Sequence, residues 1–380
     1  SSGLGVIYLI AFLSLIMQLN GLFGSEGIRP IAVFVRLLEN NGISIINVPS
    51  IFWLNNSDFF LLFICWVGLI SSLLLIIGVF SFFNALLAWF VYLSFVNLGQ
   101  PFLSFQWDVL LLEAGFLLLF IVPIKYFWKP SDNIYYSKIT MFAFKVLLFK
   151  LMFSSGLVKL FSGDTSWSNL TALDYHYFTQ PLPHFLSWFF NLFPNWVDKL
   201  SVLFMFFVEL IVPFGLFLRK KISHWSAVII SLFMTLIMFS GNYTFFNLLV
   251  IVLCFSCFYF KDSKMQIGKL NKVMTSKTII ISFIILVSLS FEFNRFVFKS
   301  QNNSQFNKVM RSFKLINQYG LFTIMTKKRV EVEVWASMDG NNWKPYKFKY
   351  KMNQKNDVPK WVWPYQPRLD WQFWFLALSI

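Results

Sequence analysis

The sequence predicts an α-helical polytopic membrane protein of about nine spans, with a small C-terminal β-sandwich-like domain on the non-cytoplasmic side. Only 13% of the 380 residues are charged and 57% are hydrophobic, too little polar surface for a soluble protein of this length. The apolar residues gather in runs long enough to cross a bilayer. After Ser312 the pattern changes to a strand-like alternation. A membrane domain is therefore expected over 1–300 and a β domain over 301–380.

The spans are expected wherever about 17–25 consecutive residues are mostly apolar. These runs lie at 4–20, 59–80, 82–104, 107–124, 138–161, 196–218, 222–240, 244–260 and 277–297. The second and third runs are nearly continuous, and their helices are expected to meet near Ser81. The polar segment 21–57 is expected to hold a short interfacial helix around Ile31–Leu38.

Basic residues between the apolar runs predict the topology. The loops 125–137, 219–221 and 261–276 are rich in Lys and Arg and are expected to be cytoplasmic. The loop 162–195 has no Lys or Arg and is expected on the outer or luminal side, together with the C-terminal region. The net charge of +15 is attributed to these basic loops rather than to nucleic-acid binding.

Two patterns describe the C-terminal region. Residues 329–351 alternate apolar and polar side chains around the turn sequence 339–342, which indicates a β-hairpin. Residues 357–375 pack aromatic side chains around prolines, which favours a strand or extended arm at the membrane surface.

The candidate functional stretch is 145–184, an apolar helix with three lysines followed by a polar, aromatic loop. Lysines inside a membrane helix are costly and usually face a cavity or an opposite charge. Two acidic residues lie inside predicted spans and are the expected partners. Two interpretations of these charged residues are open. They form ion pairs between helices, which is a structural role, or they line a polar cavity for a substrate, which is a functional role. The buried charges are Glu113, Glu209, Lys145 and Lys150, together with Lys159.

Lys159 lies at the outer end of this helix, and two interpretations are open. It could reach the interface with its long side chain, or it could act as a desolvated base, oriented by His176 or Asp174. In the structural alternative for the loop, Asp164 and Asn169 cap turns while aromatic side chains anchor it at the interface. The predicted substrate or client contacts are Asp164, Trp167, Tyr175, Tyr177, Gln180 and His184.

The residues predict neither a metal site nor a cofactor. A zinc site needs three or four ligands, and His176 has no second histidine at helical spacing. Cys254 and Cys257 form a C-x-x-C pattern inside an apolar run, so they and Cys65 are expected to be buried free thiols. No hydrolase or nucleotide-binding motif is present, so nothing in the residues alone establishes an enzyme.

Several segments together resemble the lipase maturation factor family: 106–117, 150–184, 208–214, 240–249 and 366–375. The resemblance implies a multi-spanning protein that assists the folding and assembly of secreted client lipases. It implies the endoplasmic reticulum membrane in animals, or the inner membrane in bacteria, with a luminal or periplasmic C-terminal domain. The implied partners are membrane lipid and a secreted client protein; nucleic acid is not implied, and the oligomeric state is not indicated.

The sequence departs from the family pattern at two places. The family pattern has Glu where this chain has Phe178. The chain also ends at Ile380, so its C-terminal domain is expected to be incomplete.

Residues 156–167 resemble vitamin-K-dependent carboxylase-like membrane proteins. That resemblance implies a membrane-embedded enzyme acting on a lipid or quinone-like substrate, with Lys159 as the base. A folding factor and an enzyme therefore both remain open.

Overall fold

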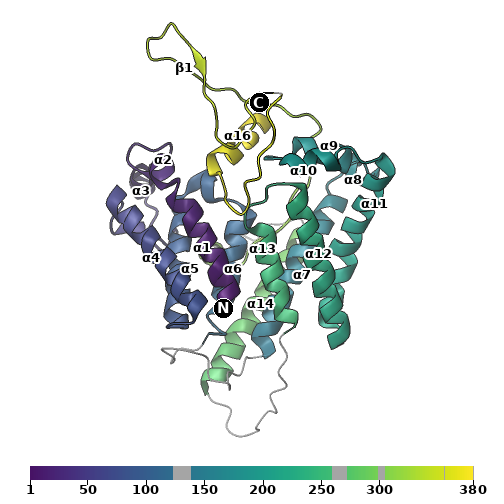
Figure 1. Cartoon of the computed structure of the whole chain (residues 1–380). Helices are drawn as coiled ribbons and strands as arrows, with labels where there is room; N and C mark the ends of the chain where they lie inside the picture. Colours follow the sequence, from purple (N-terminus) through teal and green to yellow (C-terminus); the bar gives the residue numbers. More distant parts are fainter. Residues whose placement is uncertain (123–137, 259–271, 298–303, 355, 380) are drawn as a thin grey trace.

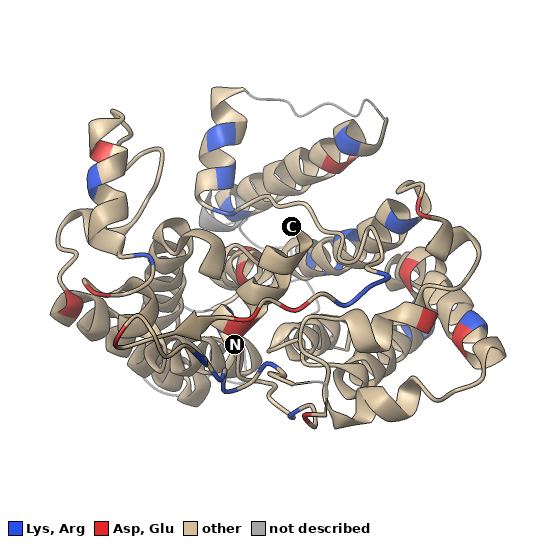
Figure 2. Cartoon of the chain, turned by 90° about the horizontal axis from the view of Figure 1, so that it is seen from above, with Lys and Arg blue, Asp and Glu red and all other residues tan. Residues whose placement is uncertain are grey.

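Long helices running up and down form the body of the protein, and one end of this bundle carries short helices and the C-terminal segment (Figure 1). The structure is a computed structural model that describes residues 1–122, 138–258, 272–297, 304–354 and 356–379. One large hydrophobic core runs through the bundle, from α1 to α14. Most charged residues lie at helix ends and in connections, as the view from above shows (Figure 2).

The described residues form sixteen α-helices, five short helices of other types and two strands. The α-helices are α1 Ser2–Ile16, α2 Leu19–Phe23, α3 Ile31–Asn40, α4 Asp58–Ile77, α5 Ser81–Leu98, α6 Gln106–Leu118, α7 Lys138–Leu160, α8 Thr165–Ser168, α9 Leu173–Thr179, α10 Phe185–Phe190, α11 Asn195–Phe206, α12 Lys220–Ser240, α13 Phe246–Cys254, α14 Lys272–Val297, α15 Gln305–Ser312 and α16 Arg368–Leu378. The remaining elements are η1 Ile51–Trp53, η2 Gln100–Leu103, η3 Phe207–Ile211, η4 Val212–Phe217, η5 Phe255–Cys257, β1 Trp335–Ala336 and β2 Lys344–Pro345.

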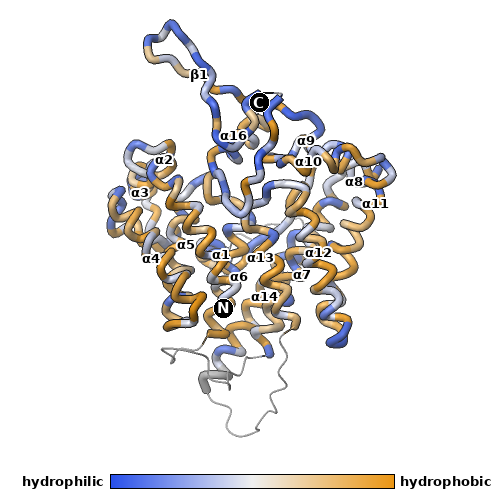
Figure 3. Tube along the Cα trace, viewed as in Figure 1, coloured by the Kyte–Doolittle hydropathy of each residue, from blue (hydrophilic) through white to orange (hydrophobic). Residues whose placement is uncertain are grey.

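Six helical segments among the described residues are long and apolar enough to cross a membrane, so the protein is an integral membrane protein. They are Asp58–Ile77, Ser81–Leu98, Lys138–Leu160, Asn195–Phe217, Lys220–Ser240 and Ser276–Val297. The other three apolar runs contain α1, α6 and α13, of 15, 13 and 9 residues. These helices are shorter than the roughly 20 residues that a full crossing needs. The helices are apolar along most of their length, while the C-terminal segment is mostly polar (Figure 3).

The junction between α4 and α5 follows from local backbone chemistry. Gly78 ends α4 in the left-handed conformation, with φ of 86°, which glycine adopts without strain. Phe80 also has a positive φ, and α5 begins at Ser81, where the two runs were predicted to meet. The predicted helix around Ile31–Leu38 is confirmed as α3.

The span 195–217 is irregular, and its irregularity positions an acidic side chain. The α-helix α11 passes into the π-helical turn η3 and then into the 3₁₀-helix η4. Pro213 lacks the N–H that would otherwise bond to the carbonyl of Glu209, so the regular α-helix cannot continue here. A Cβ on Gly156 of α7 would lie 2.5 Å from Leu210. This glycine therefore lets η3 pack closely on α7.

The predicted β-sandwich-like domain is wrong for the described C-terminal residues. The predicted hairpin is present, but its ladder is only the antiparallel pair β1–β2, around a turn with Gly340 at a φ of 74°. Both strands are exposed on both faces, so the alternating side chains have no second sheet to pack on. The predicted extended arm 357–375 is also wrong at its end, because residues from Arg368 form the helix α16.

Helix α16 is attached to the bundle by a buried ion pair. The Arg368 guanidinium donates to both carboxylate oxygens of Asp108, at 3.0 and 3.1 Å, and both residues have no exposed surface. Tyr92 also donates to Asp108, at 2.5 Å. Trp107 donates to the side-chain oxygen of Gln366 at 2.9 Å. Two segments far apart in the sequence, 106–117 and 366–375, therefore pack against each other.

The loop 162–195 and the C-terminal region lie at the same end of the bundle (Figure 1). Loop 162–195 folds into α8, α9 and α10 rather than remaining irregular. Its Asp164 accepts a hydrogen bond from the Met325 backbone at 2.6 Å, and the side chain of Asn242 accepts one from the Val362 backbone at 2.8 Å. The basic turn 219–221 lies at the opposite end. The basic loop 125–137 and most of 261–276 fall outside the described residues.

Candidate functional site

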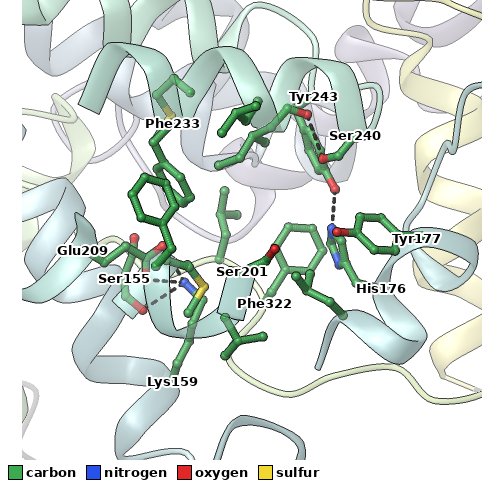
Figure 4. Close-up of a pocket in the computed structure, with 18 of the residues that line it drawn as sticks. Ser155, Lys159, His176, Tyr177, Ser201, Glu209, Phe233, Ser240, Tyr243 and Phe322 are labelled. Atoms are coloured by element: carbon green, nitrogen blue, oxygen red, sulfur yellow. Dashed lines mark hydrogen bonds and ion pairs between the residues drawn. The ribbon is translucent and has the colours of Figure 1, made fainter. Parts of the chain in front are cut away.

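A cavity of about 270 Å³ lies beneath α9, between α7, α11 and α12 (Figure 4). Most of its lining is aromatic or aliphatic, and a few polar groups converge on it. Leu321 and Phe322, from the segment that follows α15, also line it. The polar lining residues are Ser155, Lys159, His176, Tyr177, Ser201, Glu209, Ser240 and Tyr243. Lys159 and His176, two of the predicted site residues, thus share one cavity.

Lys159 is bound to a carboxylate rather than extended toward the interface. Its Nζ donates to the two oxygens of Glu209 at 2.8 and 2.7 Å, and to the Ser155 carbonyl at 3.2 Å. An ammonium group has three N–H donors, so all three are used. Both side chains of the pair are less than a tenth exposed. The lysine also lies 5.5 Å from the ring centre of Trp167, a cation–π distance.

His176 belongs to a second polar group on the other side of the cavity (Figure 4). Its Nε2 lies 2.8 Å from the Tyr243 hydroxyl, which donates to Gln180 Oε1 at 2.7 Å. The Gln180 amide nitrogen faces three acceptors, the Tyr177 and Ser240 carbonyls and the Ser187 hydroxyl, which its two hydrogens share, so the Gln180 oxygen is turned toward Tyr243. Because the tyrosine proton goes to Gln180, this network assigns the imidazole proton to Nε2. The other ring nitrogen, Nδ1, makes no hydrogen bond within the described part of the chain.

Burial lowers the pKa of His176 to about 4, and the positive charge of Lys159 adds to this effect. The unfolded chain binds a proton at this histidine below about pH 6.5, whereas the folded chain binds it only near pH 4. We therefore expect the unfolding free energy to fall as the pH decreases from about 6.5 to about 4. Thermal unfolding at several pH values, compared with His176→Asn, measures this contribution. A difference between the two proteins that does not vary with pH would contradict it.

The remaining predicted contact residues divide between the cavity and the loop that covers it. Trp167 and Tyr177 line the cavity, and Gln180 accepts a hydrogen bond from the lining residue Tyr243. Asp174 and Tyr175 do not line it, although they share α9 with His176.

Asp164 and His184 have structural contacts. Asp164 caps α8 by accepting from the Ser166 backbone at 2.9 Å. His184 is fully buried, caps α10 through Nδ1, and its Nε2 lies 3.1 Å from the Met238 carbonyl. Its ring also stacks on Trp361, with ring centres 4.9 Å apart. These two polar residues hold the loop in place from outside the cavity.

A second buried ion pair lies deeper in the bundle, away from the cavity. Lys150 donates to Glu113, and the other oxygen of Glu113 accepts from Tyr319 at 2.7 Å and from Asn317 at 3.0 Å. Lys145 donates to the Leu216 carbonyl and to Ser223, both at 2.9 Å. Both acidic residues predicted inside spans, Glu113 and Glu209, are thus paired with lysines of α7.

Sequence reasoning missed Tyr243 and Phe322 as site residues. Tyr243 lies in the segment 240–249, which was recognised only as a family motif, and its distance from His176 in the sequence gave no signal of contact. Phe322 lies in a segment without any strong pattern. The three cysteines are buried and free, as predicted. Among the residues that the structure describes, no three His, Cys, Asp or Glu side chains come together as a metal site would require.

Comparison of the sequence with known proteins matches this chain to one family. The lipase maturation factor transmembrane domain matches residues 1–266, and the lipase maturation factor C-terminal domain matches residues 315–380. Lipase maturation factor 2 of Xenopus laevis is 32% identical, over 99% of this chain and 70% of that protein. Lipase maturation factor 1 is 31% identical in Mus musculus and 30% in Homo sapiens, over 99% of this chain and 72% and 73% of those proteins.

No solved structure matches the chain. The resemblance predicted from the motifs is confirmed, since the transmembrane match covers more than half of the chain and the relatives align with nearly all of it. The bundle of apolar helices and the C-terminal segment attached to one end of it correspond to the two matched domains. The chain therefore belongs to the lipase maturation factor family.

Proposed function

We propose that this protein is a membrane-bound factor that assists the folding and assembly of secreted client lipases. Its family membership supports this role, because relatives that align with nearly the whole chain carry the name lipase maturation factor. The observation that carries the proposal is a hairpin with exposed aromatic and methionine side chains, at the end of the bundle where the loop 162–195 lies (Figure 1). A partly folded client exposes apolar surface, which such side chains can contact.

The client-contact surface is proposed to be the β1–β2 hairpin. It projects away from the helices (Figure 1), and its large side chains are exposed. Met338 at the tip is fully exposed, and the neighbouring aromatic side chains are at least half exposed. The hairpin surface consists of Trp335, Met338, Trp343 and Tyr346.

Changing Trp335 and Trp343 together to serine should reduce the secretion of active lipase several-fold while membrane levels stay normal. Both side chains are exposed, so their loss should alter stability by only about 0.5 kcal/mol. The measurement is lipase activity in the medium of cells that lack their own maturation factor, with membrane levels of each variant determined in parallel. The control is the pair of phenylalanine substitutions, which keep the apolar surface. Equal secretion with serine and with phenylalanine would remove the hairpin from the proposed contact surface.

The finer topology is also proposed. Following the chain through the bundle, α1, α4, α5, α6, α7, α11, α12, α13 and α14 alternate in direction (Figure 1), which supports nine passages. In this topology the loop 162–195 and the C-terminal segment face the lumen of the endoplasmic reticulum in a eukaryote or the periplasm in a bacterium. A secreted client would be met on that side.

Single cysteines at Ser168 and Asn341 should both react with a membrane-impermeant thiol reagent, applied to intact cells of a bacterial host or to the luminal side of microsomes. Both positions are exposed, whereas the three native cysteines are buried and give little background. A cysteine at Lys220, at the opposite end of the bundle, should react only after the membrane is opened. Reaction at one of the first two positions alone would mean that an odd number of crossings separates them.

A membrane-embedded enzyme is the second candidate function, with Lys159 as base and His176 or Asp174 as orienting groups. The observation that favours it is the shared cavity of Lys159 and His176. However, a base must first be neutral, and the three N–H donors of Lys159 are taken by Glu209 and Ser155. The proton of the pair would have to move to Glu209 before Lys159 could accept another.

A further inference from the structure

We propose that the cavity beneath α9 binds a neutral, single-chain lipid that carries a hydroxyl group, and that this lipid enters from the bilayer between α11 and α12. Monoacylglycerols are the simplest members of this chemical class. The inference goes beyond the proposed maturation role, because it concerns a ligand of the bundle itself and is tested by direct binding.

Part of the cavity lining also lies on the outer surface of the bundle. Three lining residues are also exposed on the outer surface: Phe193 by 45%, Phe204 by 41% and Leu236 by 52%. Phe204 and Leu236 lie on helical segments long and apolar enough to cross the membrane, and Phe193 lies just before the first of them. An apolar chain can therefore pass from the bilayer into the cavity without crossing water.

The walls and the size suit one flexible chain. The inner walls consist of apolar side chains from α7, α11 and α12, among them Met152, Met205 and Met234. Methionine side chains adapt to irregular ligands. The volume of about 270 Å³ is near the small end of ligand pockets. It therefore favours a single-chain lipid over a phospholipid with two chains.

The polar end of the cavity selects the head group. His176 Nδ1 and the Tyr177 hydroxyl both lie on residues that line it, and neither makes a hydrogen bond within the described part of the chain. A neutral imidazole nitrogen accepts a hydrogen bond, and a phenol both donates and accepts. A ligand with a hydroxyl donor and an ester or hydroxyl acceptor satisfies both groups.

An anionic head group does not fit this end as well. Among the described residues that line the cavity, Lys159 is the one with a positive charge; it is matched by Glu209, and its three donors are already used. A fatty-acid carboxylate would have to displace Glu209 and leave that carboxylate buried without a partner, which is costly. The cavity should therefore prefer a neutral lipid to its anionic counterpart with the same chain.

The test uses the full chain purified in detergent and a monoacylglycerol with a photoreactive diazirine in its acyl chain. Cross-links mapped by mass spectrometry should concentrate on α11 and α12 residues that line the cavity. Unlabelled monoacylglycerol should compete at least tenfold better than the fatty acid of equal chain length at neutral pH. Cross-links spread evenly over the lipid-facing helices, or equal competition by both lipids, would overturn the proposal.

Two variants and a matched control locate the site. Tyr177→Phe removes one free hydroxyl and should weaken binding about five- to tenfold, as the loss of one hydrogen bond does. Ser201→Phe fills the cavity and should abolish specific labelling. Tyr175→Phe, on the same helix but outside the cavity, should bind like the unaltered protein. If both variants fold and label normally, the proposal is wrong; if either fails to fold, the competition experiment with the unaltered protein decides.

Discussion

Replacing Arg368 with methionine should lower the free energy of unfolding by about 3–5 kcal/mol. The substitution leaves the Asp108 carboxylate buried without its cationic partner, because both residues have no exposed surface. Within the described part of the chain, Tyr92 would then be the remaining side-chain donor to Asp108. The same substitution should release α16, since Arg368 joins this helix to α6 and also donates to the Phe102 carbonyl at 2.6 Å.

Thermal unfolding of the detergent-purified protein measures this loss, and limited proteolysis of α16 measures its release. Arg36→Met is the matched control, because Arg36 is exposed on α3 and its loss should change stability by about 0.5 kcal/mol or less. The double variant Asp108→Leu with Arg368→Met removes both charges and should be more stable than Arg368→Met alone. A single variant as stable as the Arg36 control would show that the ion pair does not hold the C-terminal segment.

Replacing Lys159 with methionine should also cost about 3–5 kcal/mol, because it leaves the Glu209 carboxylate buried and unpaired. Had the lysine extended to the interface, as one interpretation of the sequence held, the substitution would have been mild. The geometry decides between these outcomes: Lys159 is 5% exposed and contacts both oxygens of Glu209. Folded yield and thermal stability in detergent are the measurements.

The double variant Lys159→Met with Glu209→Gln separates a structural role from a functional one. Since it contains no stranded charge, it should recover much of the stability lost in Lys159→Met. If secretion of active client lipase recovers with stability, the pair serves to hold η3 against α7. If the protein is stable and secretion remains absent, Lys159 has a direct functional role, and the enzyme hypothesis gains support. A double variant no more stable than Lys159→Met would contradict the pairing itself.

Helix positions were largely predictable, because hydropathy is a local property that any span must satisfy. Each predicted run contains a helix in the described residues, and the α4–α5 junction follows from Gly78. The residues at which the helices end were less predictable. The run 82–104, for example, stops being α-helical at Leu98, before the 3₁₀-turn η2 that contains Pro101.

The C-terminal region was the least predictable part of the fold. Alternation over 329–351 correctly predicted a hairpin, but alternation shows only that the two faces of a strand differ in polarity. The described residues form no further sheet that could cover either face of β1 and β2. Residues 368–378 form a helix because Pro367 provides a helix start and the bundle offers Asp108 and Trp107 as partners. Those partners lie about 260 positions earlier in the chain.

For the site, the apolar context of α7 was enough to predict that its lysines need acidic partners, because an unpaired charge is costly in any membrane helix. Which carboxylate meets which lysine depended on helix packing: the π-turn before Pro213 and the absence of a side chain at Gly156 bring Glu209 to Lys159. The partner of His176, Tyr243, is 67 positions away. No local pattern specifies such a contact, since it exists only once α9 and the end of α12 lie side by side.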